Sequence, residues 1–208
     1  MLNIGVLVSG GGTNLQVLID AQKSGRIPKG RITLVISSRA DAYALKRAEK
    51  NGIKTSMALR KDYSDTEAYS RELIRQLKDA EIDLVVMAGF LTITSDEFVK
   101  SFENRIINVH PALIPAFCGK GFYGMRVHEA ALARGVKLTG ATVHFVNEIC
   151  DGGPIILQKA VEVRDNDTPE LLQKRVMEEA EWILLPEAVS LFCDGRLKIT
   201  DGKVSIID

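Results

Sequence analysis

The stretch Asn3–Asn14, NIGVLVSGGGTN, decides the fold. It begins as a short β-branched run, NIGVLV, and continues directly into a glycine-rich turn, SGGGTN. The segment that follows, LQVLIDAQKSG, has the helical spacing of apolar residues and ends at Gly25. A buried strand joined by a tight glycine turn to a helix is the opening unit of an α/β fold.

The first half of the chain repeats this alternation. The runs RITLVIS, IKTSMA, DLVVMAG and RIINVH predict strands, and AYALKRAEKNG, DTEAYSRELIRQLKDA and SDEFVKSF predict the helices between them. Continuous apolar strands separated by helices indicate a parallel sheet that is covered on both faces. We therefore expect an α/β fold with a doubly wound, mainly parallel central sheet.

The second half predicts a different arrangement. TGATVHFV and GGPIILQKAVEV are joined by a loop too short for a parallel crossover, so we expect an antiparallel hairpin. TPELLQKRVMEEAEWILLPEAVSLFCDG predicts a long helix with Thr168 as its N-cap and a bend or break at Pro186. LKITDGKVSI predicts a terminal hairpin with an Asp-Gly turn.

Composition narrows the class of protein. The chain has 208 residues, with 27 Lys plus Arg and 27 Asp plus Glu, so its formal net charge is zero. A balanced charge argues against bulk nucleic-acid binding, and no apolar run approaches the length of a membrane span. The chain has an odd number of cysteines, Cys118, Cys150 and Cys193, and no CxxC pair. This pattern favours a reduced, cytoplasmic protein without a disulfide or a zinc signature.

The glycine-rich turn is the first candidate site. The amides of Gly12, Thr13 and Asn14 would open a helix, and unpaired N–H groups at the positive end of a helix dipole suit a phosphate. Leu15 stands where the dinucleotide fingerprint needs a small residue, and there is no Walker lysine. A single phosphate is therefore favoured over a dinucleotide; the alternative is a glycine-rich turn without a ligand.

The second candidate site is the strand end in IINVHP. Residues two apart in a strand point to the same side, so Asn108 and His110 face together at the carboxyl end of a parallel strand, where α/β sheets bind ligands. A histidine there can act as acid, base or charged donor, and an asparagine can donate to a developing oxyanion. The alternative is a structural, hydrogen-bonded histidine at a strand end.

Asp151 in CDGGP is the third candidate, because its short hairpin loop could fold over that strand end. A carboxylate beside His110 would favour the charged imidazolium, whereas the alternative role is that of a turn former. His144 either lines the same cleft or is a satisfied strand histidine. His128, in RVHEAAL, is expected on a helix surface.

Taken together, these segments resemble the folate-dependent formyltransferases over nearly the whole chain. The motifs that carry the resemblance are SGGGTNL, VVMAGFLTI, INVHPALIP, GATVHFV, DGGPIILQ and DGRL, in this order. The resemblance implies a Rossmann-like formyltransferase fold in one domain, 1–208, with a phosphate-binding half at 1–105 and a folate and catalytic half at 106–208. It also implies small-molecule substrates, namely 10-formyltetrahydrofolate as cosubstrate and glycinamide ribonucleotide as acceptor. No metal is implied, and the protein would be a monomer or homodimer.

The resemblance also implies roles for particular residues. Catalysis is carried over to Asn108, His110 and Asp151, and phosphate binding to Gly12, Thr13 and Asn14. Folate would be bound through the backbone of Leu91, Thr92, Ile93 and Thr94, with Asn108 beside it. Glu181 corresponds to the glutamate that contacts the glycinamide end. The spacing before Glu181 is one residue longer than the family pattern, so Glu178 and Glu179 are alternatives.

Three other functions were weighed against this one. Relatives that act on methionyl-tRNA carry an additional C-terminal domain, and hydrolases of formyltetrahydrofolate carry an additional N-terminal one. A length of 208 residues and a first strand that begins at residue 3 favour the transferase. A non-catalytic nucleotide-binding module would need the glycine turn but not Asn108, His110 and Asp151.

Overall fold

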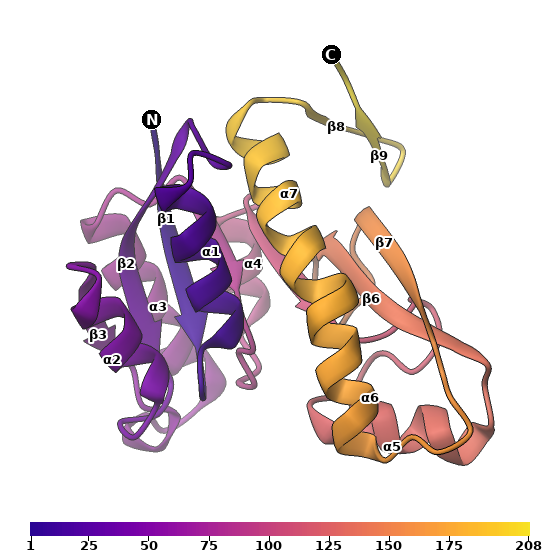
Figure 1. Cartoon of the computed structure of the whole chain (residues 1–208). Helices are drawn as coiled ribbons and strands as arrows, with labels where there is room; N and C mark the ends of the chain where they lie inside the picture. Colours follow the sequence, from indigo (N-terminus) through magenta and orange to yellow (C-terminus); the bar gives the residue numbers. More distant parts are fainter.

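A seven-stranded sheet forms the centre of the protein (Figure 1), in a computed structural model that describes residues 1–208. The spatial order is β3-β2-β1-β4-β5-β6-β7. Neighbours from β3 to β5 are parallel, and β6 and β7 add antiparallel pairs at one end, which confirms the predicted mainly parallel sheet. The strands are β1 (Leu2–Val8), β2 (Gly30–Ser37), β3 (Lys54–Met57), β4 (Leu84–Met87), β5 (Ile106–His110), β6 (Leu138–Phe145) and β7 (Ile155–Glu162).

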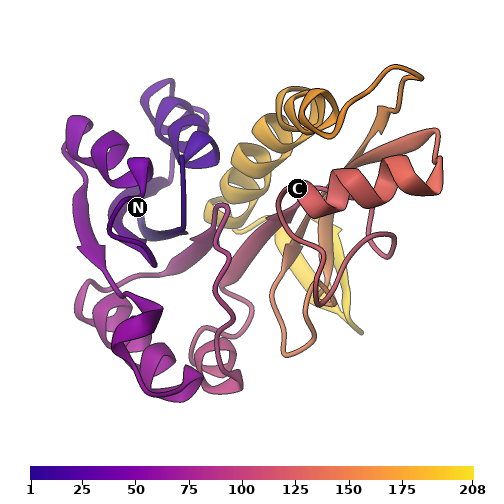
Figure 2. The same ribbon diagram turned by 90° about the horizontal axis from the view of Figure 1, so that it is seen from below.

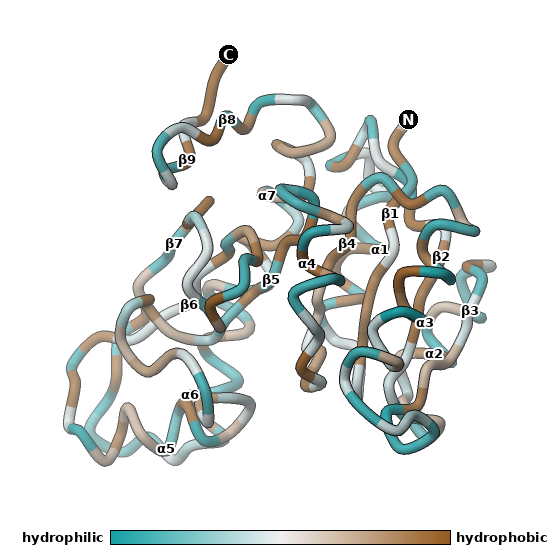
Figure 3. Tube along the Cα trace, turned by 180° about the vertical axis from the view of Figure 1, so that it is seen from behind, coloured by the Kyte–Doolittle hydropathy of each residue, from teal (hydrophilic) through white to brown (hydrophobic).

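The central strands are apolar on both faces because each face is covered by helices. In β1, Ile4 and Val6 belong to a core of 31 buried residues on one face. Leu7 belongs to a second core of 14 buried residues on the other face. The period of two along a strand thus sends successive side chains into opposite cores. In Figure 3 the central strands are largely brown, and teal recurs on outer helices and loops.

The helices divide between the two faces (Figure 2). Residues of α1, α2, α5, α6 and α7 contribute to the larger core, and residues of α3 and α4 contribute to the smaller one. The bounds are α1 (Thr13–Lys23), α2 (Tyr43–Lys50), α3 (Thr66–Asp79), α4 (Asp96–Ser101), α5 (Met125–Arg134), α6 (Pro169–Val176) and α7 (Trp182–Cys193), with a 3-10 turn at Arg60–Asp62. None of these helices combines the length and apolar character needed to cross a bilayer.

The long C-terminal helix is interrupted at a different place from the one predicted. Thr168 caps α6 by accepting a hydrogen bond from the N–H of Leu171 at 3.3 Å, as expected. Pro186, however, lies inside α7, so the helix does not break at this residue and a bend is the part of the prediction that remains. The irregularity is a π-helical turn at Met177–Glu181, where the Trp182 N–H bonds the Met177 carbonyl.

The chain ends in the predicted hairpin. Strands β8 (Leu197–Thr200) and β9 (Lys203–Ile206) pair in antiparallel fashion. The connecting residues Asp201 and Gly202 have φ values of 52° and 72°, the left-handed conformation that an Asp-Gly turn adopts. This hairpin forms a separate small sheet, and none of its residues lines the cleft described below.

Candidate active site

A cleft of about 740 Å³ opens at the carboxyl ends of the parallel strands. Its walls include the turn after β1, the segment after β4 and the end of β5. The chain leads from β1 outward to β2 on one side and from β4 outward to β5 on the other, so the strand order reverses here. Open α/β sheets bind their ligands at such a point.

The turn after β1 presents free backbone donors to the cleft. Gly12 is the N-cap of α1 with φ 72°, and a Cβ there would lie 2.6 Å from the Cβ of Ala44. Both the backbone angle and the packing therefore require glycine. The N–H groups of Gly11, Gly12, Thr13 and Asn14 make no hydrogen bond within the protein. Such unpaired donors at the start of a helix favour an anion.

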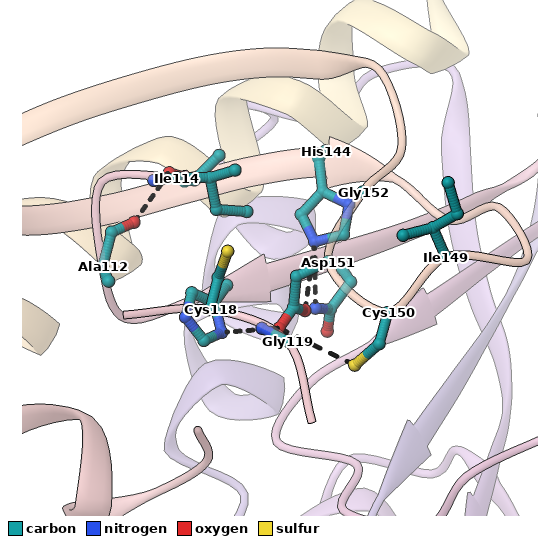
Figure 4. A network of polar contacts seen from close by, with 12 residues as sticks. Ala112, Ile114, Cys118, Gly119, His144, Ile149, Cys150, Asp151 and Gly152 are labelled. Carbon is teal, nitrogen blue, oxygen red and sulfur yellow. Dashed lines mark hydrogen bonds and ion pairs between the residues drawn. The ribbon is translucent and has the colours of Figure 1, made fainter. Parts of the chain in front are cut away.

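His110 and Asp151 lie next to each other in the wall of this cleft. His110 is only 4% exposed, and its Nδ1 is 3.5 Å from Oδ2 of Asp151. Its Nε2 is 2.8 Å from the carbonyl oxygen of Phe117, to which it donates. Asp151, at φ 54°, also accepts the N–H of Gly119 at 2.9 Å (Figure 4). The hairpin loop between β6 and β7 thus folds over the end of β5, as the sequence predicted.

Asn108 and His144 complete this polar group. The Nδ2 of Asn108 lies 3.2 Å from the Nε2 of His144. The Nδ1 of His144 donates to the carbonyl oxygen of Phe145 at 2.7 Å. His144 Nε2 is also 3.7 Å from Oδ1 of Asp151. His144 is therefore both a hydrogen-bonded strand histidine and a residue of the cleft wall.

Burial and charge act in opposite directions on His110. Burial lowers the pKa of His110 below its ordinary value, while the Asp151 carboxylate and the Phe117 carbonyl act to raise that pKa. Burial by itself raises the pKa of Asp151, but contacts with His144, His110 and the Gly119 N–H bring that pKa below its usual range. At neutral pH the free protein therefore holds an ionised Asp151 beside a mainly neutral His110. The expected influence of the carboxylate is present, but burial outweighs it.

Glu181 is the only one of the three candidate glutamates that reaches the cleft. It is 6% exposed, and its Oε2 accepts a hydrogen bond from Nδ2 of Asn14 at 2.8 Å. Glu178 and Glu179 are exposed and do not line the cleft. Burial raises the pKa of Glu181 to about 6, against the opposing effect of Asn14. Glu181 is the last residue of the π-helical turn Met177–Glu181, and its side chain meets the glycine turn through Asn14.

The segment after β4 forms an apolar part of the cleft wall. Leu91, Thr92, Ile93 and Thr94 all line the cleft. Leu91 and Ile93 are 59% and 70% exposed, so their apolar side chains are open to a ligand in the cleft. The N–H of Leu91 is donated to Oγ of Ser9 at 2.9 Å, so Leu91 offers a ligand only its carbonyl and side chain.

His128 is a cleft residue that sequence reasoning misplaced. It was expected on a helix surface, but it is 1% exposed and lines the cleft. Neither of its ring nitrogens has a hydrogen-bond partner, and burial lowers its pKa to about 4. The prediction failed because the inward face of α5 is made by Val127, His128 and Ala131. The apolar residues on either side of His128, at helical spacing, were the available signal.

The polar groups of the cleft suit an organic substrate that carries an anion. Unpaired amides occupy one end, the Glu181 carboxylate lies beside them, and Asn108, His110 and Asp151 lie further along. No three His, Cys, Asp or Glu side chains converge as ligands for a metal ion. An amide donor, an imidazole and a carboxylate in one place can stabilise an oxyanion and move a proton.

Comparisons with known proteins agree with this geometry. The model of the formyl transferase family matches residues 2–189. The phosphoribosylglycinamide formyltransferase of Escherichia coli (strain K12) is 41% identical over 201 residues, which cover 97% of this chain and 92% of that protein. The crystal structure of glycinamide ribonucleotide transformylase 1 from Symbiobacterium toebii has a TM-score of 0.94 and 44% identity, covering 100% of this chain and 95% of that one.

A further solved structure shares the fold at lower identity. A formyltetrahydrofolate deformylase from Pseudomonas syringae pv. tomato str. DC3000 has a TM-score of 0.89 and 26% identity, covering 100% of this chain and 66% of that one. The family match covers most of the chain, and the Escherichia coli relative matches almost end to end. This chain therefore belongs to the formyl transferase family.

Proposed function

We propose that this enzyme transfers the formyl group of 10-formyltetrahydrofolate to the primary amine of 5'-phosphoribosylglycinamide, a step of purine biosynthesis. Relatives with this activity in their names match nearly the whole chain. The observation that carries the proposal is a single cleft with unpaired amides at one end and Asn108, His110 and Asp151 further along. The first group suits the phosphate of the acceptor, and the second suits the reacting formyl group.

The ribonucleotide would be held by the glycine turn and by Glu181, whose carboxylate lies next to that turn through its hydrogen bond to Asn14. Its phosphate would accept hydrogen bonds from the N–H groups of Gly12, Thr13 and Asn14. Its glycinamide end would lie against Glu181, whose carboxylate accepts N–H bonds. With a pKa of about 6, Glu181 is ionised at neutral pH. An anionic acceptor beside the nucleophile would orient the amine for attack.

The folate would occupy the other part of the cleft. The exposed side chains of Leu91 and Ile93 would cover its flat ring system, and the backbone of Thr92 and Thr94 would supply hydrogen bonds. Asn108 would then lie between the folate and the ribonucleotide. The acceptor would be bound by residues from both halves, 1–105 and 106–208, since Glu181 lies in the second.

The chemistry requires an oxyanion site and a path for one proton. The amine nitrogen attacks the formyl carbon, and the carbonyl oxygen becomes negative. The Nδ2 of Asn108 and a ring N–H of His110 would donate to this oxygen. The C–N10 bond of the folate then breaks, and the proton lost by the attacking amine passes to N10. Loss of one oxyanion donor typically lowers the rate by about 100- to 1000-fold.

The lowered pKa of His110 fits this sequence of events. In the free protein the Nε2–H of His110 is donated to the Phe117 carbonyl, and a substrate oxygen would replace that acceptor. A negative oxygen next to the ring favours the protonated form. The proton lost by the attacking amine would therefore be held by His110 while the oxyanion exists, with Asp151 stabilising the charge, before it passes to N10.

Hydrolysis of the folate is the second candidate. It is favoured by the likeness to the deformylase from Pseudomonas syringae pv. tomato str. DC3000. In that reaction water takes the place of the amine, and the same oxyanion site serves. The free amides of the glycine turn would then have no phosphate to bind, which makes hydrolysis the weaker reading.

The deciding experiment is an assay with 10-formyltetrahydrofolate, with and without 5'-phosphoribosylglycinamide. We expect formylated ribonucleotide in equal amount to the folate released, and negligible release without the ribonucleotide. Release of formate that does not depend on the ribonucleotide would establish hydrolysis instead. Failure of the protein to bind either compound would reject both functions.

A further inference from the structure

Helix α2 holds the back of the glycine turn by two successive carbonyl groups. The backbone N–H of Ala44 donates to the carbonyl oxygen of Gly10 at 3.1 Å. The side chain of Arg47, one turn further along α2, donates from Nε to the carbonyl oxygen of Gly11 at 2.8 Å. The turn is therefore fixed from the side that faces away from its free amides.

These two contacts determine where the amides point. In a trans peptide unit the C=O of one residue and the N–H of the next point in opposite directions. Holding the Gly10 carbonyl against α2 aims the Gly11 N–H away from α2, and holding the Gly11 carbonyl does the same for Gly12. Both N–H groups make no hydrogen bond within the protein. A donor on the carbonyl also polarises the peptide, which strengthens its N–H as a donor.

The guanidinium of Arg47 is itself restrained. Its Nη1 lies 3.3 Å from Oε1 of Gln16 on α1. Its Cζ lies 5.0 Å from the ring centroid of Tyr43, within the range of a cation–π contact. Its Nη2 makes no hydrogen bond. Arg47 thus links α1, α2 and the turn, and it is not neutralised by any carboxylate within salt-bridge distance.

On its cleft side, the glycine turn has no Lys or Arg side chain of its own that could balance the charge of a phosphate. Lys120 is the one basic residue of the cleft wall, and it belongs to the loop before α5, not to the turn. On the cleft side, the carboxylate of Glu181 is bonded to Asn14 of the turn. A phosphate dianion placed on the turn would meet a carboxylate in front and no cation. The charge of Arg47 lies directly behind the peptide units that would bind it.

We propose that Arg47 is a positioning residue for phosphate recognition: it orients and polarises the Gly11–Gly12 peptide and supplies the positive charge that the cleft wall lacks. This inference rests on the proposed function, because it assumes a phosphorylated substrate on the turn. If the inference is correct, the selectivity of the cleft for a phosphate depends on Arg47, a residue that does not line the cleft.

The test compares three variants. Arg47→Met removes the charge and the donor, and Arg47→Lys keeps the charge. Arg39→Met is the matched control, since Arg39 carries the same charge close to α2 but pairs only with Asp41 at 2.8 Å. The measured quantities are KM for 5'-phosphoribosylglycinamide, KM for the folate, the inhibition constant of ribose 5-phosphate, and the urea midpoint of unfolding.

For Arg47→Met we expect KM for the ribonucleotide and the inhibition constant of ribose 5-phosphate to rise together by about tenfold or more. KM for the folate should stay unchanged, Arg47→Lys should recover part of the loss, and Arg39→Met should behave as the unaltered protein. Equal increases for ribonucleotide and folate, or an unchanged ribose 5-phosphate constant, would overturn the proposal.

The outcome also separates this inference from the proposed function. Direct binding of ribose 5-phosphate can be measured by calorimetry without any turnover. If the protein transfers no formyl group but binds ribose 5-phosphate in an Arg47-dependent manner, the proposed reaction fails and the role of Arg47 stands. If formyl transfer occurs and Arg47→Met does not alter the affinity for ribose 5-phosphate, the proposed reaction stands and the role of Arg47 fails.

Discussion

Replacing Asp151 by Asn separates its two possible roles, because the change preserves the turn and removes only the charge. Asp151 adopts a φ of 54°, a left-handed conformation that Asn tolerates as well as Asp. The Asn side-chain oxygen can still accept the N–H of Gly119, now at 2.9 Å from Oδ2. A residue that only forms the turn would therefore be replaced without loss of activity.

The electrostatic effect of the same change is large. A unit charge 3.5 Å from the ring of His110 contributes about 5 kcal/mol at an effective dielectric constant of about 20. Relaxation and water entry reduce this figure, so we expect a rate loss of about 100- to 1000-fold, or roughly 3 to 4 kcal/mol. The sign follows from the physical cause: Asp151 raises the pKa of His110, so its removal moves the His110 titration to lower pH.

The assay is a pH–rate profile together with an NMR titration of His110 in both proteins. Asp201→Asn is the matched control, because Asp201 also has a positive φ, 52°, in the turn between β8 and β9. This control should leave rate and titration unchanged. A fully active Asp151→Asn enzyme with an unmoved His110 titration would refute the reasoning and leave Asp151 as a turn residue.

Three further outcomes are expected. Gly12→Val forces a Cβ to within 2.6 Å of Ala44; ribonucleotide KM should rise while folate KM stays constant, and a parallel rise of both would contradict a local phosphate site. Glu181→Gln should raise the free energy of unfolding in urea by up to about 2 kcal/mol at pH 8 but not at pH 4. The reason is that the folded protein, in which the pKa of Glu181 is raised to about 6, becomes less stable as the pH increases through that value and the buried carboxyl ionises. The exposed Glu187→Gln should show no such effect. His128→Leu should reduce the loss of stability between pH 6.5 and 4 by up to about 3 kcal/mol, because the histidine binds a proton in this range in the unfolded chain but not in the folded one. The same loss of stability in both proteins over this pH range would contradict a neutral, buried His128.

The parts of the fold that follow from local pattern were predictable. Apolar runs such as DLVVMAG identify strands that are buried on both faces. The loop that contains Asp151 is too short for a parallel crossover, so β6 and β7 have to pair in antiparallel fashion. The turn at 201–202 was predictable because an Asp-Gly pair favours the left-handed backbone that both residues adopt. In each case the information lies within a few adjacent residues. The positions of Asn108 and His110 follow in the same way from the period of a strand and its parallel neighbours.

Features that depend on three-dimensional packing were not predictable. The surface position expected for His128 was wrong because the packing of α5 decides which of its faces is buried. The net pKa of His110 depends on the balance between burial and Asp151, and only the carboxylate was visible in the sequence. Pro186 predicted a bend or break, but α7 continues through it, and the irregular turn lies further back, at Met177–Glu181.

The π-helical turn at Met177–Glu181 holds one residue more than an α-helical turn and ends at the buried carboxylate of Glu181. One extra residue in a regular α-helix rotates everything beyond it by about 100°. Here Leu172 and Val176 before the π-helical turn, and Leu184 after it, all remain in the larger core. The widened turn therefore confines the rotation to itself and leaves Glu181 against Asn14. Because core packing on both sides fixes the turn, the protein can hold a buried carboxylate whose pKa is raised to about 6, in a position that costs stability at neutral pH.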